Sequence, residues 1–393
     1  MDRRELLKSG LLVAGAAAVG LTGCSKSNQE VVDSEISTKM PKQKEKFNIT
    51  TPLPFNHDLI DEMADMNNIY KKSKITTLYN NIPKPLNSDF NDFFTVSRGY
   101  NDKIKTYDDF AKYFGHARDK GFEIVYVLNS PKSFSKEDYE SRRDKLYSQL
   151  DFLHDIGCNH LRIGNTQLLS IIAKYKHKFN VSASTTFEFH NTRQYINLFK
   201  NYPFITGIDI SSDENRNFPF LKNLHKLFPN VTLEVLVNEP CIMGCPARMS
   251  HTMSDIYIFE CGKIRDNVLD MCRTANIYPW NLSYYQNVGV NSFKISSWPL
   301  RANFNSLYFL RNYMDCIEGD IEKSEMSFQF FVNMLFLRYS RYSEDVKVRD
   351  ILKYLPGIRR FIKNGDKCAT RCGVECTYCD ECADKIKKII GEK

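Results

Sequence analysis

The 393-residue sequence lacks the motifs that assign the most common enzymatic functions. It contains no His-Glu-x-x-His and no Gly-x-Ser-x-Gly, and none of its eight histidines form pairs at helical spacing, so no zinc or serine peptidase signature is present. No apolar stretch reaches the roughly 20 residues that span a bilayer. The positive excess, 54 Lys plus Arg against 47 Asp plus Glu, is small and scattered, so nucleic acid is not an expected partner.

Cysteine is also scarce for a disulfide-built scaffold, which needs above roughly 8 to 10% of a short chain. Nine of the twelve cysteines nevertheless fall in two groups, between Cys241 and Cys272 and between Cys368 and Cys382. Such close spacing is typical of thiolates that bind a metal, whereas structural disulfides usually join distant elements. Outside these groups we expect Cys158 and Cys316 to be ordinary packing residues.

The N-terminus resembles a bacterial export signal. Arg3 and Arg4 precede an apolar run, residues 11–21, which leads into Leu21-Thr22-Gly23-Cys24. The paired arginines are typical of a twin-arginine signal, and the end of the run resembles a lipobox. We therefore expect residues 1–23 to be a signal peptide, Cys24 to be lipidated and residues 24–46 to form a flexible linker. This predicts export by the twin-arginine machinery and a lipid-anchored membrane protein facing the cell envelope.

The body alternates short β-rich segments with longer amphipathic ones, which predicts a parallel sheet. The eight candidate strands are residues 75–79, 93–96, 122–128, 160–163, 179–184, 204–210, 231–237 and 292–295, and the clearest helical patterns are 107–120, 136–156, 191–200 and 221–228. Eight such units favour an α/β fold, a (β/α)8 TIM-like barrel over residues 47–365. A doubly wound sheet is the alternative, but it usually has a glycine-rich turn after its first strand, and none follows Tyr79.

Polar residues end several of these strands, at the face where such barrels place their sites. They are Asn129, Asn165, Asp209 and Asn238. Each asparagine taken singly is more often a helix cap than a ligand. Asp209 and Glu234 lie on neighbouring strands and can form a carboxylate pair, although isolated strand acids more often serve as hydrogen-bonded structural groups.

The first cysteine group follows the predicted seventh strand. Cys241 and Cys245 stand at its carboxyl end, and Cys261 and Cys272 come after them. Four thiolates can hold either zinc or an iron-sulfur cluster, and spacing alone does not decide between the two. One Cys-x3-Cys plus two separate cysteines suits a cubane cluster better than the paired Cys-x2-Cys knuckles of structural zinc. The alternative is that Cys261 and Cys272 are small core residues.

The second group lies in a polar segment, residues 366–393, that has no core of its own. Its five members are Cys368, Cys372, Cys376, Cys379 and Cys382. Metal or disulfides would have to stabilise such a segment. With Cys24 lipidated an odd number of cysteines remains, so complete pairing is impossible, and we favour a second metal site holding iron-sulfur or zinc. A third arrangement is that tail thiols complete the first site.

A string of these motifs resembles the collagenase-like peptidase U-32 family. The matching residues, from about 76 to 315, are Ser97-Arg98-Gly99, Val127-Leu128-Asn129, Asp213-Glu214-Asn215-Arg216, Glu234-x-Leu-Val-Asn-x-x-Cys241 with Cys245, Cys261 and Cys272, then Gly289 to Ile295 and Tyr308 to Asp315. The resemblance implies a barrel-like domain, a four-iron four-sulfur cluster held by four cysteines, and oxygen-independent hydroxylation. The family name comes from a reported collagenase activity.

The sequence departs from the family after Lys294-Ile295, where Ser296-Ser297-Trp298 replaces the usual Glu-Gly-Arg. The residues that remain as candidates to contact a small or anionic substrate, or to surround the cluster, are Arg216, Glu234, Arg248, His251 and Lys294. We therefore expect an iron-sulfur protein with redox or oxygen-independent hydroxylation chemistry. The alternatives are a cell-envelope peptidase of the collagenase-like kind, or a non-catalytic, metal-stabilised binding protein of the envelope.

The export hypothesis gives a direct prediction. Replacing both Arg3 and Arg4 by Lys should leave the unprocessed precursor in the cytoplasm, because the twin-arginine machinery recognises the arginine pair. Cell fractionation with immunoblotting measures this, and replacing the nearby Lys8 by Arg serves as the control. Unchanged localisation of the double variant would refute the signal.

Overall fold

The computed structural model describes residues 41–82, 94–95, 104–239, 241–253, 268–296, 307–336 and 344–391. Arg3, Arg4, Cys24 and Cys261 lie outside these residues, and so does the side chain of His251. Residues 41–391 belong to one compact unit. Within the described residues no helix is both long and apolar enough to cross a membrane.

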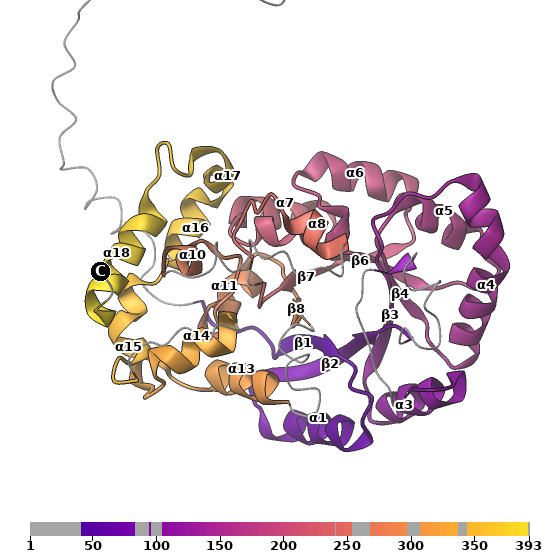
Figure 1. Ribbon diagram of the computed structural model, residues 1–393, viewed down its shortest axis with the longest axis horizontal. Helices are drawn as coiled ribbons and strands as arrows, with labels where there is room; N and C mark the ends of the chain where they lie inside the picture. Colours follow the sequence, from indigo (N-terminus) through magenta and orange to yellow (C-terminus); the bar gives the residue numbers. More distant parts are fainter. Residues whose placement is uncertain are drawn as a thin grey trace, which may run out of the picture. The chain divides into compact units, whose positions relative to one another are not determined.

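Eight parallel strands close into a barrel, in which each strand pairs with its neighbours in sequence and β1 pairs with β8 (Figure 1). The strands are β1 (Phe47–Pro52), β2 (Ser73–Asn80), β3 (Glu123–Leu128), β4 (His160–Ile163), β5 (Asn180–Ala183), β6 (Ile205–Asp209), β7 (Thr232–Leu236) and β8 (Ser292–Lys294). This confirms the (β/α)8 barrel and excludes the doubly wound sheet.

The predicted strand 75–79 is β2, but the predicted strand 93–96 was wrong and the first strand of the barrel was not predicted. Phe94, in the predicted strand 93–96, has helical backbone, and Phe93 and Val96 lie outside the described residues. The barrel instead begins one unit earlier, with Phe47–Pro52, whose Ile49 and Thr50 pair with both β2 and β8. The segment was overlooked because it ends in proline and has consecutive threonines, which blur the apolar alternation of a strand.

Helices surround the barrel and continue past it. They are α1 (His57–Ile69), α3 (Tyr107–Asp119), α4 (Lys136–Asp155), α5 (Thr166–Lys174), α6 (Thr192–Asn201), α7 (Phe218–Leu227), α8 (Arg248–Met253), α10 (Val268–Arg273), α11 (Leu282–Asn287), α13 (Tyr308–Glu318), α14 (Phe328–Phe336), α15 (Val348–Ile351), α16 (Ile358–Asn364), α17 (Cys368–Arg371) and α18 (Tyr378–Ile390).

Local sequence explains where the barrel helices begin and end. Capping boxes of Thr106 with Asp109 and of Ser135 with Asp138 start α3 and α4, satisfying backbone N–H groups that have no intrahelical acceptor. Gly121 and Gly157 follow these helices with φ of 86° and 82°, a conformation that glycine adopts without steric cost. The chain can therefore reverse sharply into β3 and β4, as the sequence predicted.

The barrel has an apolar exterior and a polar interior. In β4, Leu161 and Ile163 are buried in the hydrophobic core that packs against the helices. Arg162 stands between them, and the alternation of a strand turns it to the opposite face. Glu234 and Lys294 are likewise buried polar residues of β7 and β8. The interior must therefore satisfy buried charges, and this concentrates chemically capable side chains along the barrel axis.

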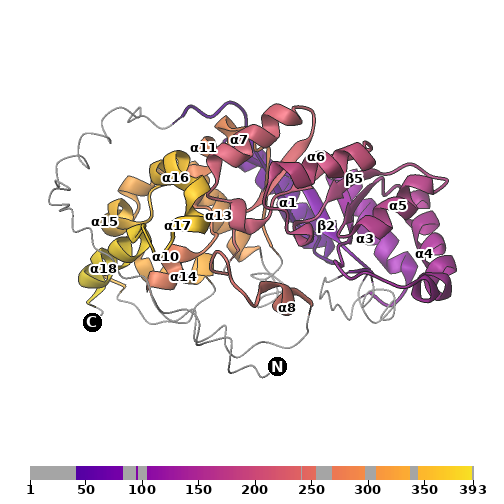
Figure 2. The same cartoon turned by 90° about the horizontal axis from the view of Figure 1, so that it is seen from above.

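The C-terminal helices pack on one side of the barrel. In Figures 1 and 2 the yellow helices α16 to α18 lie beside α10, and α10 contacts α18 while α7 contacts α16. Gly365 is essential to this packing, because a Cβ atom there would lie 1.7 Å from the carbonyl oxygen of Arg216. The cysteine-rich tail thus shares a core with α7 and α10.

Residues 41–46, expected to belong to the linker, are also attached to the barrel. Gln43 donates to the carbonyl of Lys72 at 2.6 Å, and the backbone N–H of Lys44 donates to Oε1 of Gln286 at 2.9 Å. The chain is therefore held in place by hydrogen bonds before β1 begins.

Candidate functional site

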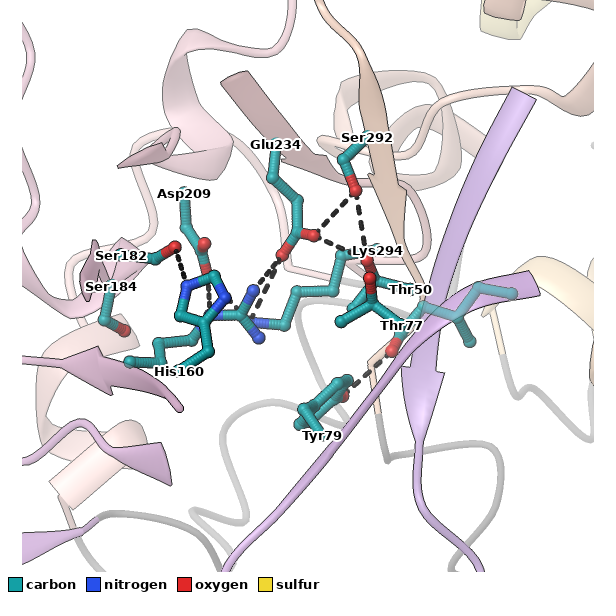
Figure 3. A network of polar contacts seen from close by, with 12 residues as sticks. Thr50, Thr77, Tyr79, His160, Ser182, Ser184, Asp209, Glu234, Ser292 and Lys294 are labelled. Carbon is teal, nitrogen blue, oxygen red and sulfur yellow. Dashed lines mark hydrogen bonds and ion pairs between the residues drawn. The ribbon is translucent and has the colours of Figure 1, made fainter. Parts of the chain in front are cut away.

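Four buried charged residues meet inside the barrel, and Figure 3 shows Asp209, Glu234 and Lys294 pointing toward one another. Arg162 Nη2 lies 2.5 Å from Glu234 Oε1, and its Nε lies 2.8 Å from Asp209 Oδ2. Lys294 Nζ donates to the same Asp209 oxygen at 2.7 Å. Two cations face two anions, so the network has no net charge, which limits the several kcal/mol that each buried ion would otherwise cost.

Neutral groups complete this network. Thr50 and Ser292 donate to Glu234 Oε2 at 2.7 and 2.8 Å. The ring of Tyr79 lies 4.8 Å from Lys294 Nζ and 5.5 Å from Arg162 Cζ, within range for cation–π attraction. Both oxygens of Glu234 are therefore engaged, and the network is arranged as a rigid support.

The two cations determine how the interior acids and bases ionise. Burial tends to raise the pKa of Asp209, but Arg162 and Lys294 outweigh it, so that pKa lies below its ordinary value. Burial lowers the pKa of Lys294, and the neighbouring Arg162 adds to this effect. Asp209 is consequently held ionised. Lys294 releases its proton more readily than an ordinary lysine does.

The structure brings together Asp209, Glu234 and Lys294, which were singled out from sequence, because Asp209 and Glu234 are register partners of β6 and β7. Arg162 was missed. The available signal was a guanidinium in the middle of a four-residue strand whose neighbours are Leu161 and Ile163. An arginine at such a position almost always has a buried acid as its partner.

A second group lies at the carboxyl ends of the strands, formed by Glu188, His190, Asp213 and Arg248; we call it the carboxyl-end mouth. Glu188, His190 and Asp213 each offer a ligand atom within 4.8 Å of the other two. Glu188 has φ of 47°, the only left-handed backbone of a non-glycine residue in the described residues. One imidazole and two carboxylates form a donor set suited to a divalent cation.

Hydrogen bonds fix the orientation of these side chains. Ser211 donates to Glu188 Oε2 at 2.7 Å, and His190 Nδ1 lies 3.2 Å from Glu214 Oε1. Burial raises the pKa of Glu188, and the hydrogen bond with Glu214 raises the pKa of His190. Glu188 therefore keeps its proton to a higher pH than an ordinary glutamate does. His190 likewise keeps its proton to a higher pH than an isolated histidine does.

Arg248 is the least satisfied residue of the mouth. It is 8% exposed, and its Nη2 lies 2.7 Å from Asp213 Oδ1 and 3.0 Å from the carbonyl oxygen of Ile242. Its Nε and Nη1 atoms are buried without a hydrogen-bond partner in the described part of the chain. Because unpaired buried donors are costly, an anionic ligand is the natural partner for these two N–H groups.

The loop after β7 places Cys241 and Cys245 beside this mouth. Cys241 is buried and Cys245 is half-buried. The backbone N–H of Gly244 donates to Asp213 Oδ1 at 2.8 Å, and Cys241 is one of the electrostatic neighbours of Arg248. These two cysteines thus lie at the carboxyl face, where the sequence placed them.

Cys272 has its backbone beside the β7 loop but its thiol beside the C-terminal tail. The backbone next to it is tied to the β7 loop, since Met243 N–H donates to the Arg273 carbonyl at 3.0 Å and Ala275 N–H to the Cys241 carbonyl at 3.2 Å. The electrostatic neighbours of its thiol, however, are Cys379 and Cys382 of α18. The thiols of the β7 loop and of Cys272 are soft donors of the kind that bind an iron-sulfur cluster. Cys272 lies between that loop and the tail.

Arg216, a predicted substrate contact, lies against the same tail. Its Nη2 donates to the carbonyls of Cys272 and Thr274 at 2.8 and 2.7 Å, and its Nη1 lies 3.5 Å from the Cys379 sulfur. The ring of Phe361 covers its guanidinium at 4.4 Å. The structure therefore gives Arg216 a position among thiols, away from the carboxyl-end mouth residues.

A third polar group lies at the amino ends of the strands, around a cavity of about 240 Å³. His160 Nε2 is 2.8 Å from Ser182 Oγ, a contact drawn in Figure 3, and His160 Nδ1 is 2.7 Å from Glu123 Oε1. A Cβ atom at Gly207 would lie 2.4 Å from Ser182 Oγ, so glycine there leaves room for the serine. Sequence motifs missed this trio because its members come from three separate strands.

Comparison with known proteins finds distant relatives. No protein-family model matches the chain. The "Uncharacterized protease MJ1657" of Methanocaldococcus jannaschii is 24% identical over 215 residues, which cover 48% of this chain and 60% of that protein. Among solved structures, the U32 peptidase Mk0906 aligns at 12% identity over 67% of this chain and 96% of its own, with a TM-score of 0.41. SrfJ from Salmonella typhimurium aligns at 10% identity over 65% of each chain, with a TM-score of 0.35.

The charge neutrality of the interior network is testable. Asp209→Asn leaves Arg162 and Lys294 facing one carboxylate and should lower the free energy of unfolding by about 3–5 kcal/mol. Adding Lys294→Met restores neutrality, so the double variant should be about 1–4 kcal/mol more stable than Asp209→Asn alone. Urea unfolding measures both, with the exposed Asp119→Asn as the control. If the loss of unfolding free energy in the double variant equals the sum of the losses in the two single variants, the two residues do not interact and the network is contradicted.

Proposed function

We propose that this chain is a barrel enzyme of the U-32 type that binds an anionic substrate at the carboxyl-end mouth. The observation that carries the proposal is Arg248, a buried cation with two N–H groups that have no partner in the described residues. The motif string from Glu234 to Cys245 and the 24% identity to a protein named as a protease support the U-32 type. The carboxyl face is also where barrel enzymes hold their substrates.

Each residue of the mouth has a distinct part in this proposal. Arg248 donates its free Nε–H and Nη1–H groups, which point to different sides of the guanidinium, to oxygens of an anion such as a carboxylate or phosphate. Asp213 holds Arg248 in orientation through the remaining nitrogen. Glu188 and His190 lie beside the bound anion, where each can accept or return a proton because its pKa is raised.

Thiolates supply the redox component. The resemblance assigns a four-iron four-sulfur cluster to Cys241, Cys245, Cys261 and Cys272, and the described members are soft donors from two adjoining segments. Such a cluster, when bound, supplies one-electron redox chemistry whose potential depends on nearby hydrogen bonds and burial. The reaction class we propose is redox, of the oxygen-independent hydroxylation kind that the resemblance implies.

A second candidate function, peptide or ester hydrolysis, is favoured by the trio at the amino end. Ser182, His160 and Glu123 have the contacts of a nucleophile, its general base and the residue that orients the base. Ser182 Oγ would attack the carbonyl carbon while His160 Nε2 takes its proton, and the leaving group would depart with that proton. A water molecule, deprotonated by His160, would then release the acyl group as a carboxylic acid and return the proton to Ser182. Arg162 lines the same cavity, and its Nη1 has no partner among the described residues, which suits a developing oxyanion.

Binding of inorganic phosphate tests the first proposal. Arg248→Gln should weaken phosphate binding about 10- to 100-fold, because charged hydrogen bonds contribute about 1.5–3 kcal/mol. Isothermal titration calorimetry on the full chain measures this, and Arg193→Gln, an exposed arginine of α6, is the matched control. Equal weakening in both variants, or in neither, would refute a built anion site at Arg248.

A fluorophosphonate probe tests the second candidate, since it reacts with serines that a neighbouring base activates. Hydrolysis at the amino-end trio predicts covalent labelling that is lost in Ser182→Ala, reduced in Glu123→Gln and retained in Ser184→Ala, the next serine along the same segment. Mass spectrometry of labelled peptides locates the adduct. Absence of any label on Ser182 in folded protein would rule out the hydrolytic reaction.

A further inference from the structure

The tail cysteines and Cys272 gather around one buried arginine, although they are about a hundred residues apart in sequence. Cys272 and Cys382 are buried in the core, and Cys368 and Cys379 are partly buried against it. Cys379 is an electrostatic neighbour of Cys272, Cys368 and Cys382. Cys379 therefore lies at the centre of a group that α10, α17 and α18 bring together.

The helices that carry these thiols are fixed to one another. Arg273 Nη2 on α10 lies 2.5 Å from Asp380 Oδ1 on α18, next to Cys272 and Cys379 in sequence. Tyr378 on α18 accepts a hydrogen bond at its Oη from the N–H of Gly357 at 2.8 Å, which ties α18 to the start of α16. On α18, Cys379 and Cys382 are three residues apart and so project from the same face. The sulfur positions are thus set by packing that does not depend on a disulfide.

The cysteines surround a buried positive charge, the guanidinium of Arg216, which needs an anion beside it. Arg216 is 6% exposed, and its hydrogen bonds go to two carbonyls and to the Cys379 sulfur. No carboxylate among the described residues forms an ion pair with it. A buried guanidinium without an anion costs several kcal/mol. The groups that face it and can become anionic include Cys379 and Cys368.

Free thiols do not meet this requirement on their own. A buried thiol that keeps its proton carries no charge to offset that of Arg216. Coordination to a metal removes the thiol proton outright. A metal group held by several thiolates therefore supplies the negative charge that Arg216 lacks.

Among the described residues, the thiols are not gathered as closely as a single tetrahedral ion requires. A tetrahedral zinc with bonds of about 2.3 Å holds its sulfurs roughly 3.8 Å apart. Among the described residues, the groups of three donors within 4.8 Å of one another do not include the thiols. An iron-sulfur cluster binds each thiolate to a different iron and so accepts a wider arrangement.

We propose that Cys272, Cys368, Cys379 and Cys382 hold one iron-sulfur cluster between α10 and the tail, with Arg216 as its buried counter-charge. The proposal takes Cys272 from the mouth-side set and joins it to the tail; it deepens the proposed redox function and rests on it for the nature of the metal group. Cys372 and Cys376 are also electrostatic neighbours of Cys368. Cys372 is exposed, however, and Cys376 does not pack against the core, so the proposal leaves both outside the ligand set.

Anaerobic metal analysis of the full chain tests the ligand set. Cys272→Ser and Cys382→Ser should each lose about four iron and four sulfide per chain relative to wild type, together with the matching visible absorption. The loss in Cys382→Ser separates this ligand set from the set of Cys241, Cys245, Cys261 and Cys272, because Cys382 belongs only to the tail. Cys372→Ser, in the same tail, and Cys158→Ser, buried elsewhere, should retain both. Cys272→Ser protein that folds and keeps wild-type iron and absorption would overturn the site. Its phosphate binding at Arg248 reports separately on the proposed function and should be unchanged.

Arg216 variants keep every cysteine and so test the site if Cys272→Ser does not fold. Removing a neighbouring cation disfavours the reduced, more negative state of a cluster, so Arg216→Gln should shift the reduction potential to a more negative value, and Arg216→Lys should restore much of it. Anaerobic redox titration followed by electron paramagnetic resonance measures the shift. An unchanged potential in Arg216→Gln would refute the counter-charge role.

Discussion

Buried positive charge must have an anion beside it, and this requirement organises the whole molecule. Inside the barrel, Arg162 and Lys294 meet Asp209 and Glu234, so the charges of that network balance. Arg248 at the mouth has only Asp213 and keeps two free N–H groups. Arg216 has carbonyls and a thiol but no carboxylate in the described residues. The first case gives stability, and the other two indicate what the protein binds.

The two cations bond to carbonyls of two segments that pair with each other: Arg248 donates to Ile242, and Arg216 donates to Cys272 and Thr274. The loop from Cys241 to Cys245 contacts the mouth through Gly244 and Asp213. It also pairs with residues 273–275, which follow Cys272 on α10. Only a few directly hydrogen-bonded residues separate the thiols near Arg216 from the mouth. This arrangement suits a redox group that acts next to a substrate site without being exposed at the mouth.

Sequence predicted the barrel, seven of the eight strand positions and the pairing of Asp209 with Glu234, because strand periodicity and parallel register are local signals. It singled out Lys294 as a candidate substrate contact and not as their partner. Sequence did not predict the features that depend on contacts between distant segments. Phe94 has the composition of a strand but lies in helical backbone. Arg162, the trio of Glu123, His160 and Ser182, and the approach of Cys272 to α18 are set by closure of the barrel and docking of the tail, which no motif spacing records.

The proposed cluster between α10 and the tail is the central claim, and iron-edge anomalous diffraction from anaerobically grown crystals tests it most directly. The account predicts an anomalous peak between α10 and α18, within bonding distance of Cys272, Cys368, Cys379 and Cys382 and close to the guanidinium of Arg216. Electron density that joins these cysteines as disulfides, or iron found only beside Cys241 and Cys245, would contradict it.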